Sequence, residues 1–148
     1  MGILDSDFQL IIRLIAAAIF GGILGLEREF HGKEAGLRTY SLVSLGSALV
    51  MLVSIHMYET YRHETAIDPG RIAAQVITGI GFLGAGTIIQ SRQGIKGLTT
   101  AAGIWTSSGI GLACGMGYFR AAIVAMLTAL LVLTGFSWLG RKMGSRDV

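Results

Sequence analysis

The chain has 148 residues, of which 52% are hydrophobic and only 14% are charged. A typical soluble domain is about 25% charged, so the composition excludes an ordinary soluble protein. The long apolar stretches also exclude a disordered chain. The formal net charge is +3 at pH 7, and no basic patch is large enough to bind nucleic acid. The composition therefore indicates a membrane protein.

Five apolar segments are long enough to cross a membrane as helices. A helix rises about 1.5 Å per residue and the hydrocarbon core is roughly 30 Å thick, so about 20 residues span it. The sequence predicts an all-α, polytopic membrane helix bundle that forms one domain over residues 1–148. The expected transmembrane helices cover residues 8–26, 39–57, 72–90, 98–119 and 121–139.

The basic residues between these segments predict an orientation. Lys and Arg concentrate in the cytoplasmic loops of membrane proteins. Eight of them fall on one side of the expected bundle: Arg28, Lys33, Arg38, Arg92, Lys96, Arg141, Lys142 and Arg146. Three fall on the other: Arg62, Arg71 and Arg120. We therefore expect the N-terminus outside and the C-terminus in the cytoplasm.

Glycines are unusually frequent in the apolar segments. In lipid, small residues let helix backbones approach closely, so residues 72–119 are expected to form a glycine-lined helical hairpin at the centre of the bundle. Trp105 is expected to pack against the glycines of the third segment. The glycines assigned to helix packing, within or between subunits, are Gly21, Gly25, Gly79, Gly81, Gly84, Gly86, Gly111 and Gly115.

Several polar residues sit at or within the third and first segments. Asp68 precedes Pro69, a pair typical of a helix start, while Arg71 opposes the helix dipole and so needs a partner. Gln75 is the only amide more than two residues from the end of a span; it indicates either a hydrogen bond between helices or part of a polar pathway. Arg13 either extends to the interface or pairs inside the bundle.

The first inner loop, residues 25–39, gathers charges of both signs, including Glu27, Arg28, Glu29 and Arg38, with Thr39 at its end. This pattern is compatible with a solvated interfacial loop, with a salt-bridged collar, or with a site for a hydrated cation or an anionic head group. At the start of the fourth segment, Thr99 and Thr100 are expected to cap the helix.

The sequence gives no indication of catalysis. It has no nucleophile elbow and no phosphate-binding loop, so we expect no enzyme and no cofactor other than a possible Mg²⁺ ion. Candidate ligands for that ion are Glu27, Glu29 and Asp68. None of the nine acidic residues lies in the middle of a span, which disfavours a conventional ion-coupled carrier.

Several ordered motifs resemble the transmembrane domain of the MgtC/SapB family of bacterial inner-membrane proteins. They are GLERE and GKEAGLRT, then DPGRIAAQVITGIGFLGAGTII, then KGLTTAAGIW and SSGIGLACGMG, and they cover about residues 21–117. The positions that the motifs mark are Glu27, Arg28, Glu29, Gly36, Arg38, Thr39, Arg71, Gln75, Gly79, Gly81, Phe82, Gly84, Gly86, Gly97, Thr99, Thr100 and Trp105. The MgtC branch adds a soluble cytoplasmic domain, so the resemblance points to a shorter, SapB-like form.

This resemblance implies a link to growth in low magnesium and, in the MgtC branch, survival inside host phagocytes with inhibition of the F-type ATP synthase. We expect a non-enzymatic inner-membrane protein of magnesium homeostasis or virulence-related stress adaptation. It would form a homo-oligomer, with a dimer favoured, and bind partner membrane proteins such as that synthase. The alternative is a transporter or channel for Mg²⁺ or another cation, with Glu27 and Glu29 collecting ions and Gln75 lining the path.

Overall fold

A computed structural model describes residues 3–64, 68–92 and 94–136. These residues form five α-helices: α1 (Ile3–Phe30), α2 (Leu37–Tyr61), α3 (Pro69–Gly86), α4 (Leu98–Met116) and α5 (Phe119–Leu131). A π-helical stretch, η1 (Val132–Phe136), continues α5. Two short strands, β1 (Ile89–Ser91) and β2 (Gly94–Lys96), join α3 to α4. The predicted all-α bundle is confirmed.

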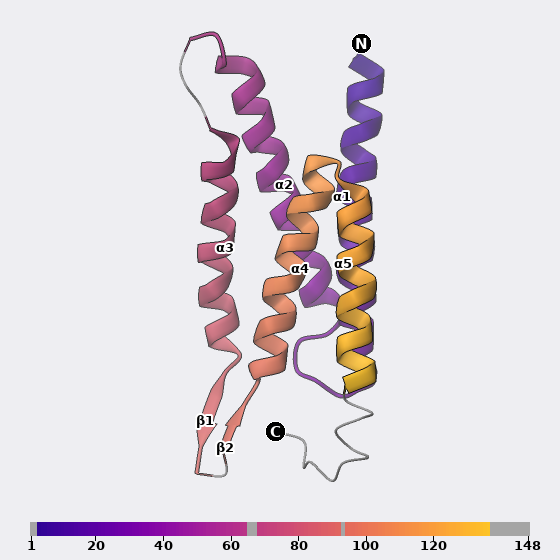
Figure 1. The fold of residues 1–148 in the computed structure, drawn as a ribbon, viewed down its shortest axis with the longest axis vertical. Coiled ribbons are helices and arrows are strands. Elements are labelled where there is room, and N and C mark those ends of the chain that lie inside the picture. Colours follow the sequence, from indigo (N-terminus) through magenta and orange to yellow (C-terminus); the bar gives the residue numbers. More distant parts are fainter. Residues whose placement is uncertain (1–2, 65–67, 93, 137–148) are drawn as a thin grey trace.

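The helices run up and down beside one another, so the connections gather at two ends (Figure 1). One end, here called the hairpin end, carries the α1–α2 loop and the β1–β2 hairpin. The opposite end carries the start of α1, the end of α2, the start of α3 and the α4–α5 turn. The sequence order thus places the first inner loop and the start of α4 at the same end.

The core is built where α1, α2 and α4 meet, and its contacts are made through glycine. A Cβ atom on Gly21 of α1 would lie 2.5 Å from the carbonyl oxygen of Tyr40 in α2, and one on Gly115 of α4 would lie 2.5 Å from that of Ala48. Gly111 is pressed against the Ser44 carbonyl in the same way. No side chain fits at these positions, and the packing use predicted for Gly21, Gly25, Gly111 and Gly115 therefore holds within one chain.

The expected central hairpin of residues 72–119 is wrong in two respects. The helix of the third segment ends at Gly86, and residues 89–96 form an antiparallel pair in which Ile89 faces Lys96 and Ser91 faces Gly94. Gly94 and Gly97 have φ angles of +127° and +87°, which only glycine adopts readily. In addition, α3 lies at the edge of the bundle, where its main contacts are with α2 and α4, and not at its centre (Figure 1).

A tight turn at Gly117 separates α4 from α5. Gly117 has a φ angle of +81°, and its N–H donates to Cys114 while that of Tyr118 donates to Ala113, the pattern of a glycine C-cap. Arg13 of α1 donates from Nη1 to the Gly115 carbonyl at 3.0 Å. Arg13 thus pairs inside the chain, where its charge suits the negative end of α4.

Three helical stretches of the described chain are long and apolar enough to cross a membrane: Asp7–Phe30, Leu37–Tyr61 and Phe119–Phe136. The helices α3 and α4 have 18 and 19 residues. They fall outside this group because polar and small residues lower their mean hydropathy, chiefly Arg71 and Gln75 in α3 and the threonines, serines and glycines in α4. Residues 137–139 of the fifth expected span, and the basic residues Arg141, Lys142 and Arg146, lie outside the described part.

Candidate functional site at the hairpin end

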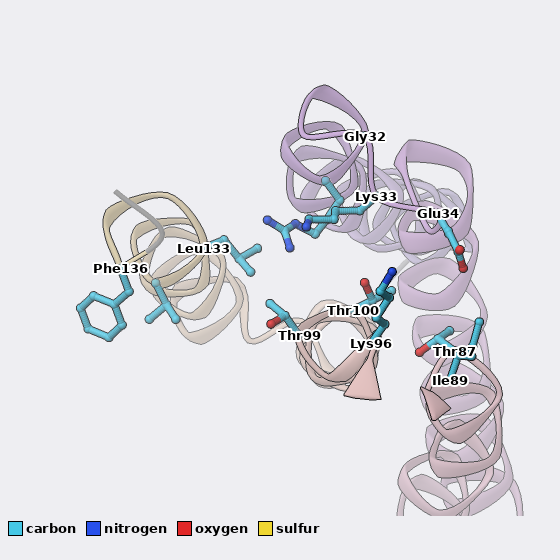
Figure 2. A pocket seen from close by; sticks show the side chains of 13 residues that line it. Gly32, Lys33, Glu34, Thr87, Ile89, Lys96, Thr99, Thr100, Leu133 and Phe136 are labelled. Atoms are coloured by element: carbon cyan, nitrogen blue, oxygen red, sulfur yellow. The ribbon is translucent and has the colours of Figure 1, made fainter. Parts of the chain in front are cut away.

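A cavity of about 590 Å³ opens at the hairpin end, and four separate segments of the chain form its walls. The first wall is the end of α1 with the α1–α2 loop, and the second is the junction of α3 with the two strands. The start of α4 forms the third wall and η1 the fourth. Figure 2 shows Lys33 and Glu34 facing Lys96 and Thr100 across the cavity, with Leu133 on another side.

The end of α1 holds a buried ion pair beside this cavity. Arg28 and Glu27 are 4% and 8% exposed. Arg28 donates from Nε to Glu27 Oε2 at 2.6 Å and from Nη2 to Oε1 at 3.1 Å. His31 Nδ1 lies 3.1 Å from the same Oε1. Glu27 and Arg28 belong to the last turn of α1 and are buried, so for these two residues an ion pair and not a solvated loop is found.

The chain turns directly after this pair through a Schellman motif. Gly32 has a φ angle of +61° and donates to the Glu29 carbonyl at 3.0 Å, while the Lys33 N–H donates to the Arg28 carbonyl at 3.0 Å. This geometry fixes the backbone of Lys33 next to that of Arg28. Two basic side chains of the α1 end therefore line the same cavity.

The remaining marked residues of the first inner loop fix the start of α2. Glu29 Oε2 accepts a hydrogen bond from the Leu37 N–H at 2.8 Å, so this carboxylate caps α2 from outside its own sequence. Arg38 and Thr39 are exposed on the first turn of α2. They are close in sequence to the lining residues Lys33 and Glu34, but they do not line the cavity themselves.

The expected capping of α4 by threonine is wrong. The N-cap residue is Gly97, in a left-handed conformation, and no side chain caps the helix. Thr99 and Thr100 are the second and third residues of α4 and line the cavity instead. Thr100 is buried, and its carbonyl accepts a hydrogen bond from the Tyr40 hydroxyl at 3.3 Å. The uncapped amino end of α4 therefore faces the charged cavity.

The polar and glycine residues of α3 are placed differently from expectation. Of the four glycines in residues 79–86, only Gly84 is placed against another helix, at Ala101 of α4, where a Cβ would have an ordinary contact of 3.7 Å with the Ala101 side chain. A Cβ added to Gly79, Gly81 or Gly86 would have no neighbour within 4 Å. In a glycine-lined hairpin these glycines would face α4. In the structure the side of α3 that carries Ile80 is buried against the bundle, and these three glycines lie elsewhere on the helix.

Arg71 and Gln75 follow this outward face of α3, as both side chains are exposed. Neither makes a hydrogen bond or ion pair with the described residues, so Gln75 does not join two helices of this chain. Asp68 caps α3 as predicted, because its Oδ1 accepts from the Gly70 N–H at 2.8 Å.

Trp105 does not pack against the glycines of α3. Its side chain is 53% exposed, on the outer side of α4. The α4 residue that does meet a large side chain is Gly103, which lies against the phenol of Tyr40. Sequence reasoning missed both Gly103 and Tyr40, although Tyr40 is fully buried at the centre of the core.

The three candidate ligands for Mg²⁺ do not fit a shared ion site. Glu27 is held by Arg28, Glu29 caps α2, and Asp68 caps α3 at the opposite end of the bundle. Within residues 3–64, 68–92 and 94–136, no group of three His, Cys, Asp or Glu side chains comes together as a metal site would require. Each carboxylate has a structural contact in place of a metal.

Comparison with known proteins decides the family. Residues 14–142, most of the chain, match the family described as the MgtC family. The chain belongs to the MgtC family. The resemblance seen in its motifs is thereby confirmed, and it extends beyond them to α1 and to the residues after α5. No solved structure matches the chain.

Curated relatives in the MgtC family are similar over nearly the whole chain. The chain is 48% identical over 141 residues to the Escherichia coli (strain K12) protein named "Putative magnesium transporter YhiD". It is 44% identical over 124 residues to protein MgtC of Salmonella typhimurium and 38% identical over 143 residues to protein SapB of Bacillus subtilis. These alignments cover 94%, 83% and 93% of the chain, but 66%, 50% and 61% of the relatives. The chain thus spans half to two thirds of their length.

Proposed function

We propose that the chain is a multi-pass protein of the bacterial inner membrane, with the N-terminus outside and the hairpin end in the cytoplasm. Three apolar helical stretches support a membrane location. The hairpin end carries Arg28, Lys33, Arg38, Arg92 and Lys96 among the described residues, and this excess of basic residues favours the cytoplasmic side.

Within that membrane, we infer a role in magnesium homeostasis and in adaptation to low Mg²⁺ and virulence-related stress. The role is non-enzymatic and is exerted by binding other membrane proteins. The name of one relative, "Putative magnesium transporter YhiD", supports the link to magnesium. The match to protein MgtC supports the link to the family. The relatives are longer than the part that matches this chain, so the role of the whole relatives is assigned to this chain only as a proposal.

The outward face of α3 is the observation that carries the binding proposal. Gly79, Gly81 and Gly86 have open space beside them, and Phe82 is 82% exposed in their midst. Glycine weakens a helix by about 1 kcal/mol relative to alanine, so three glycines without any contact cost stability within the chain. In a bilayer, an approaching helix can pack against such a face closely.

A second copy of the chain is the occupant that we propose for this face, which gives a dimer. Gln75 lies on the same face and would then meet its counterpart or another polar group across the contact. An amide inside a membrane is expected to face protein or water and not lipid tails. A different membrane protein, such as the F-type ATP synthase that the family resemblance suggests, is the other candidate partner.

Cross-linking through single cysteines tests the contact directly. Cys114 is buried in the core, so the unchanged chain should form no cross-linked dimer. Phe82→Cys should give a dimer when a short bifunctional thiol reagent is added to native membranes. Leu42→Cys is the matched control, because residue 42 is 66% exposed and lies near the start of α2, as Phe82 lies near the end of α3. Equal cross-linking at both positions, or none at Phe82→Cys, would contradict a specific α3 contact.

Transport of Mg²⁺ or another cation is the second candidate function, and the name carried by YhiD favours it. Purified chain in proteoliposomes would be tested for Mg²⁺ uptake with an enclosed fluorescent indicator. A transporter should exceed empty liposomes, and Gln75→Leu should reduce the flux if the amide lines the path. Flux equal to that of empty liposomes would remove this function and leave the binding role.

A further inference from the structure

The charges of the hairpin-end cavity are predominantly basic and incompletely paired. Its lining contains Arg28, Lys33 and Lys96 against a single carboxylate, that of Glu34. Neither lysine forms an ion pair with any residue of the described chain. Arg28 gives Nε and Nη2 to Glu27, and its Nη1 donates to no described residue. The cavity is thus suited to an anion.

The helix α4 adds partial positive charge to the same place. Gly97, Thr99 and Thr100 line the cavity at its amino end, where no side chain caps the first turn. The free N–H groups and the dipole of a 19-residue helix favour a negative group there. The two threonine hydroxyls can donate to the same ligand. The two lysine charges, the remaining Nη1 group of the paired Arg28 and the helix end therefore act on one volume.

An apolar groove leads away from this cavity between α4 and α5. It has a volume of about 540 Å³, and small residues such as Ala102, Gly103 and Ala125 leave room in it. Thr99, Val132 and Leu133 line both the groove and the cavity, so the two spaces adjoin. A free inorganic anion would use only the charged part. A ligand with an anionic head and a hydrocarbon tail would use both parts.

We propose that this combined site binds an anionic phospholipid, with its phosphate head group in the cavity beside Arg28, Lys33 and Lys96 and an acyl chain in the α4–α5 groove. Basic pockets between membrane helices on the cytoplasmic side suit such head groups. The hairpin end is the cytoplasmic end in the proposed orientation. The lipid would come from the inner leaflet and would join the α1–α2 loop, the start of α4 and η1 into one unit.

The test uses the full chain purified in detergent and freed of lipid. Its thermal unfolding midpoint is measured against phosphatidylglycerol, against phosphatidylethanolamine with the same acyl chains, and against inorganic phosphate, and bound lipid is counted by native mass spectrometry. Phosphatidylglycerol should bind and raise the midpoint, and the other two should have much smaller effects. An equal effect of both lipids would overturn the charge argument. An equal effect of inorganic phosphate would overturn the role of the tail.

Variants locate the site. The double change Lys33→Gln with Lys96→Gln should weaken phosphatidylglycerol binding on the order of tenfold, since each lysine near an anionic lipid surface contributes appreciably. Both lysines are exposed, so folding should persist. Arg120→Gln is the matched control, because Arg120 is an exposed cation of α5 at the opposite end. Equal weakening by the control would refute the site.

A groove variant tests the position of the acyl chain. Ala125 is exposed and lines the groove, so Ala125→Trp should fill it and displace the lipid without disturbing the core. Unchanged phosphatidylglycerol binding in this variant would contradict the proposed tail position. A cross-link between two copies through Ala125→Cys in lipid-free protein would identify a second copy, and not a lipid, as the occupant of the groove.

Discussion

The glycines of α4 and the glycines of α3 look alike in the sequence but do different things in the structure. On α4, Gly111 and Gly115 lie so close to the backbone of α2 that no side chain could be added, whereas a Cβ on Gly109 would have open space. On α3, a Cβ on Gly79, Gly81 or Gly86 would have no neighbour within 4 Å. The first set builds the fold of one chain. The second set has no packing role inside it.

This difference bears on function. A glycine that is pressed against a backbone is explained by the contact it allows. A membrane helix that keeps three glycines on an open face lacks such an explanation within the chain, and a contact with another helix would supply one. The tight glycine contacts therefore lie in the core of α1, α2 and α4, while the open face of α3 is the surface on which we propose association.

The largest expected effect is on the polar end of the core. Glu27→Leu should lower the free energy of unfolding by about 3–5 kcal/mol, because it leaves the buried Arg28 guanidinium without its carboxylate. Unfolding of the purified chain in detergent, followed by circular dichroism, measures the loss. The double change Glu27→Leu with Arg28→Leu should recover much of it, and a double variant as unstable as the single one would show that the ion pair is not the cause.

Alanine scanning of the glycines tests the comparison itself. Gly111→Ala should destabilise the chain by about 1–3 kcal/mol, since the new methyl group meets the Ser44 carbonyl. Gly81→Ala should leave stability unchanged or raise it by up to about 1 kcal/mol, because alanine favours the helix and has open space there. The same unfolding assay compares the two, and similar losses at both positions would erase the distinction between core and edge.

The helices and the α3 cap could be predicted because they depend on local sequence. Continuous apolar stretches identified all five helices, and Asp68 before Pro69 identified the start of α3. The β-hairpin could not be seen in this way. Ile88 and Ile89 extend the apolar run of the third segment beyond the end of α3. Gly94 at the start of β2 and Gly97 before α4, both with positive φ angles, are the residues that mark the break.

The candidate site was only partly predictable, because it is made by segments that are distant in the chain. The charges of the first inner loop suggested an anionic head group as one alternative. That Lys33 and Lys96 line one cavity depends on how α1 and α4 pack, which no local pattern reveals. The same holds for glycine, since helical spacing says which residues share a face but not what that face touches.

The cap of the edge helix is expected to have a smaller effect than either core change. Asp68→Ala removes the acceptor for the Gly70 N–H and should cost about 1 kcal/mol. Asp68→Asn keeps a side-chain oxygen at the same position and should cost less. Amide hydrogen exchange over residues 68–75 would localise the change to the first turns of α3. Faster exchange in α1 or α4 instead would mean that α3 supports the core more than its edge position suggests.

The smallest change is expected at Ser44, the residue against which Gly111 packs. Its hydroxyl is fully buried and has no hydrogen-bond partner in the part of the chain that the structure describes. Because an unpaired buried hydroxyl is unfavourable, Ser44→Ala should leave the unfolding free energy unchanged or raise it by about 1 kcal/mol. Ser107→Ala is the matched control, since that hydroxyl donates to the Tyr40 carbonyl at 3.0 Å and its removal should destabilise. A loss at Ser44 as large as that at Ser107 would mean that the Ser44 hydroxyl does have a partner in the membrane, such as a trapped water, and that the α1–α2–α4 core is not closed by glycine contacts alone.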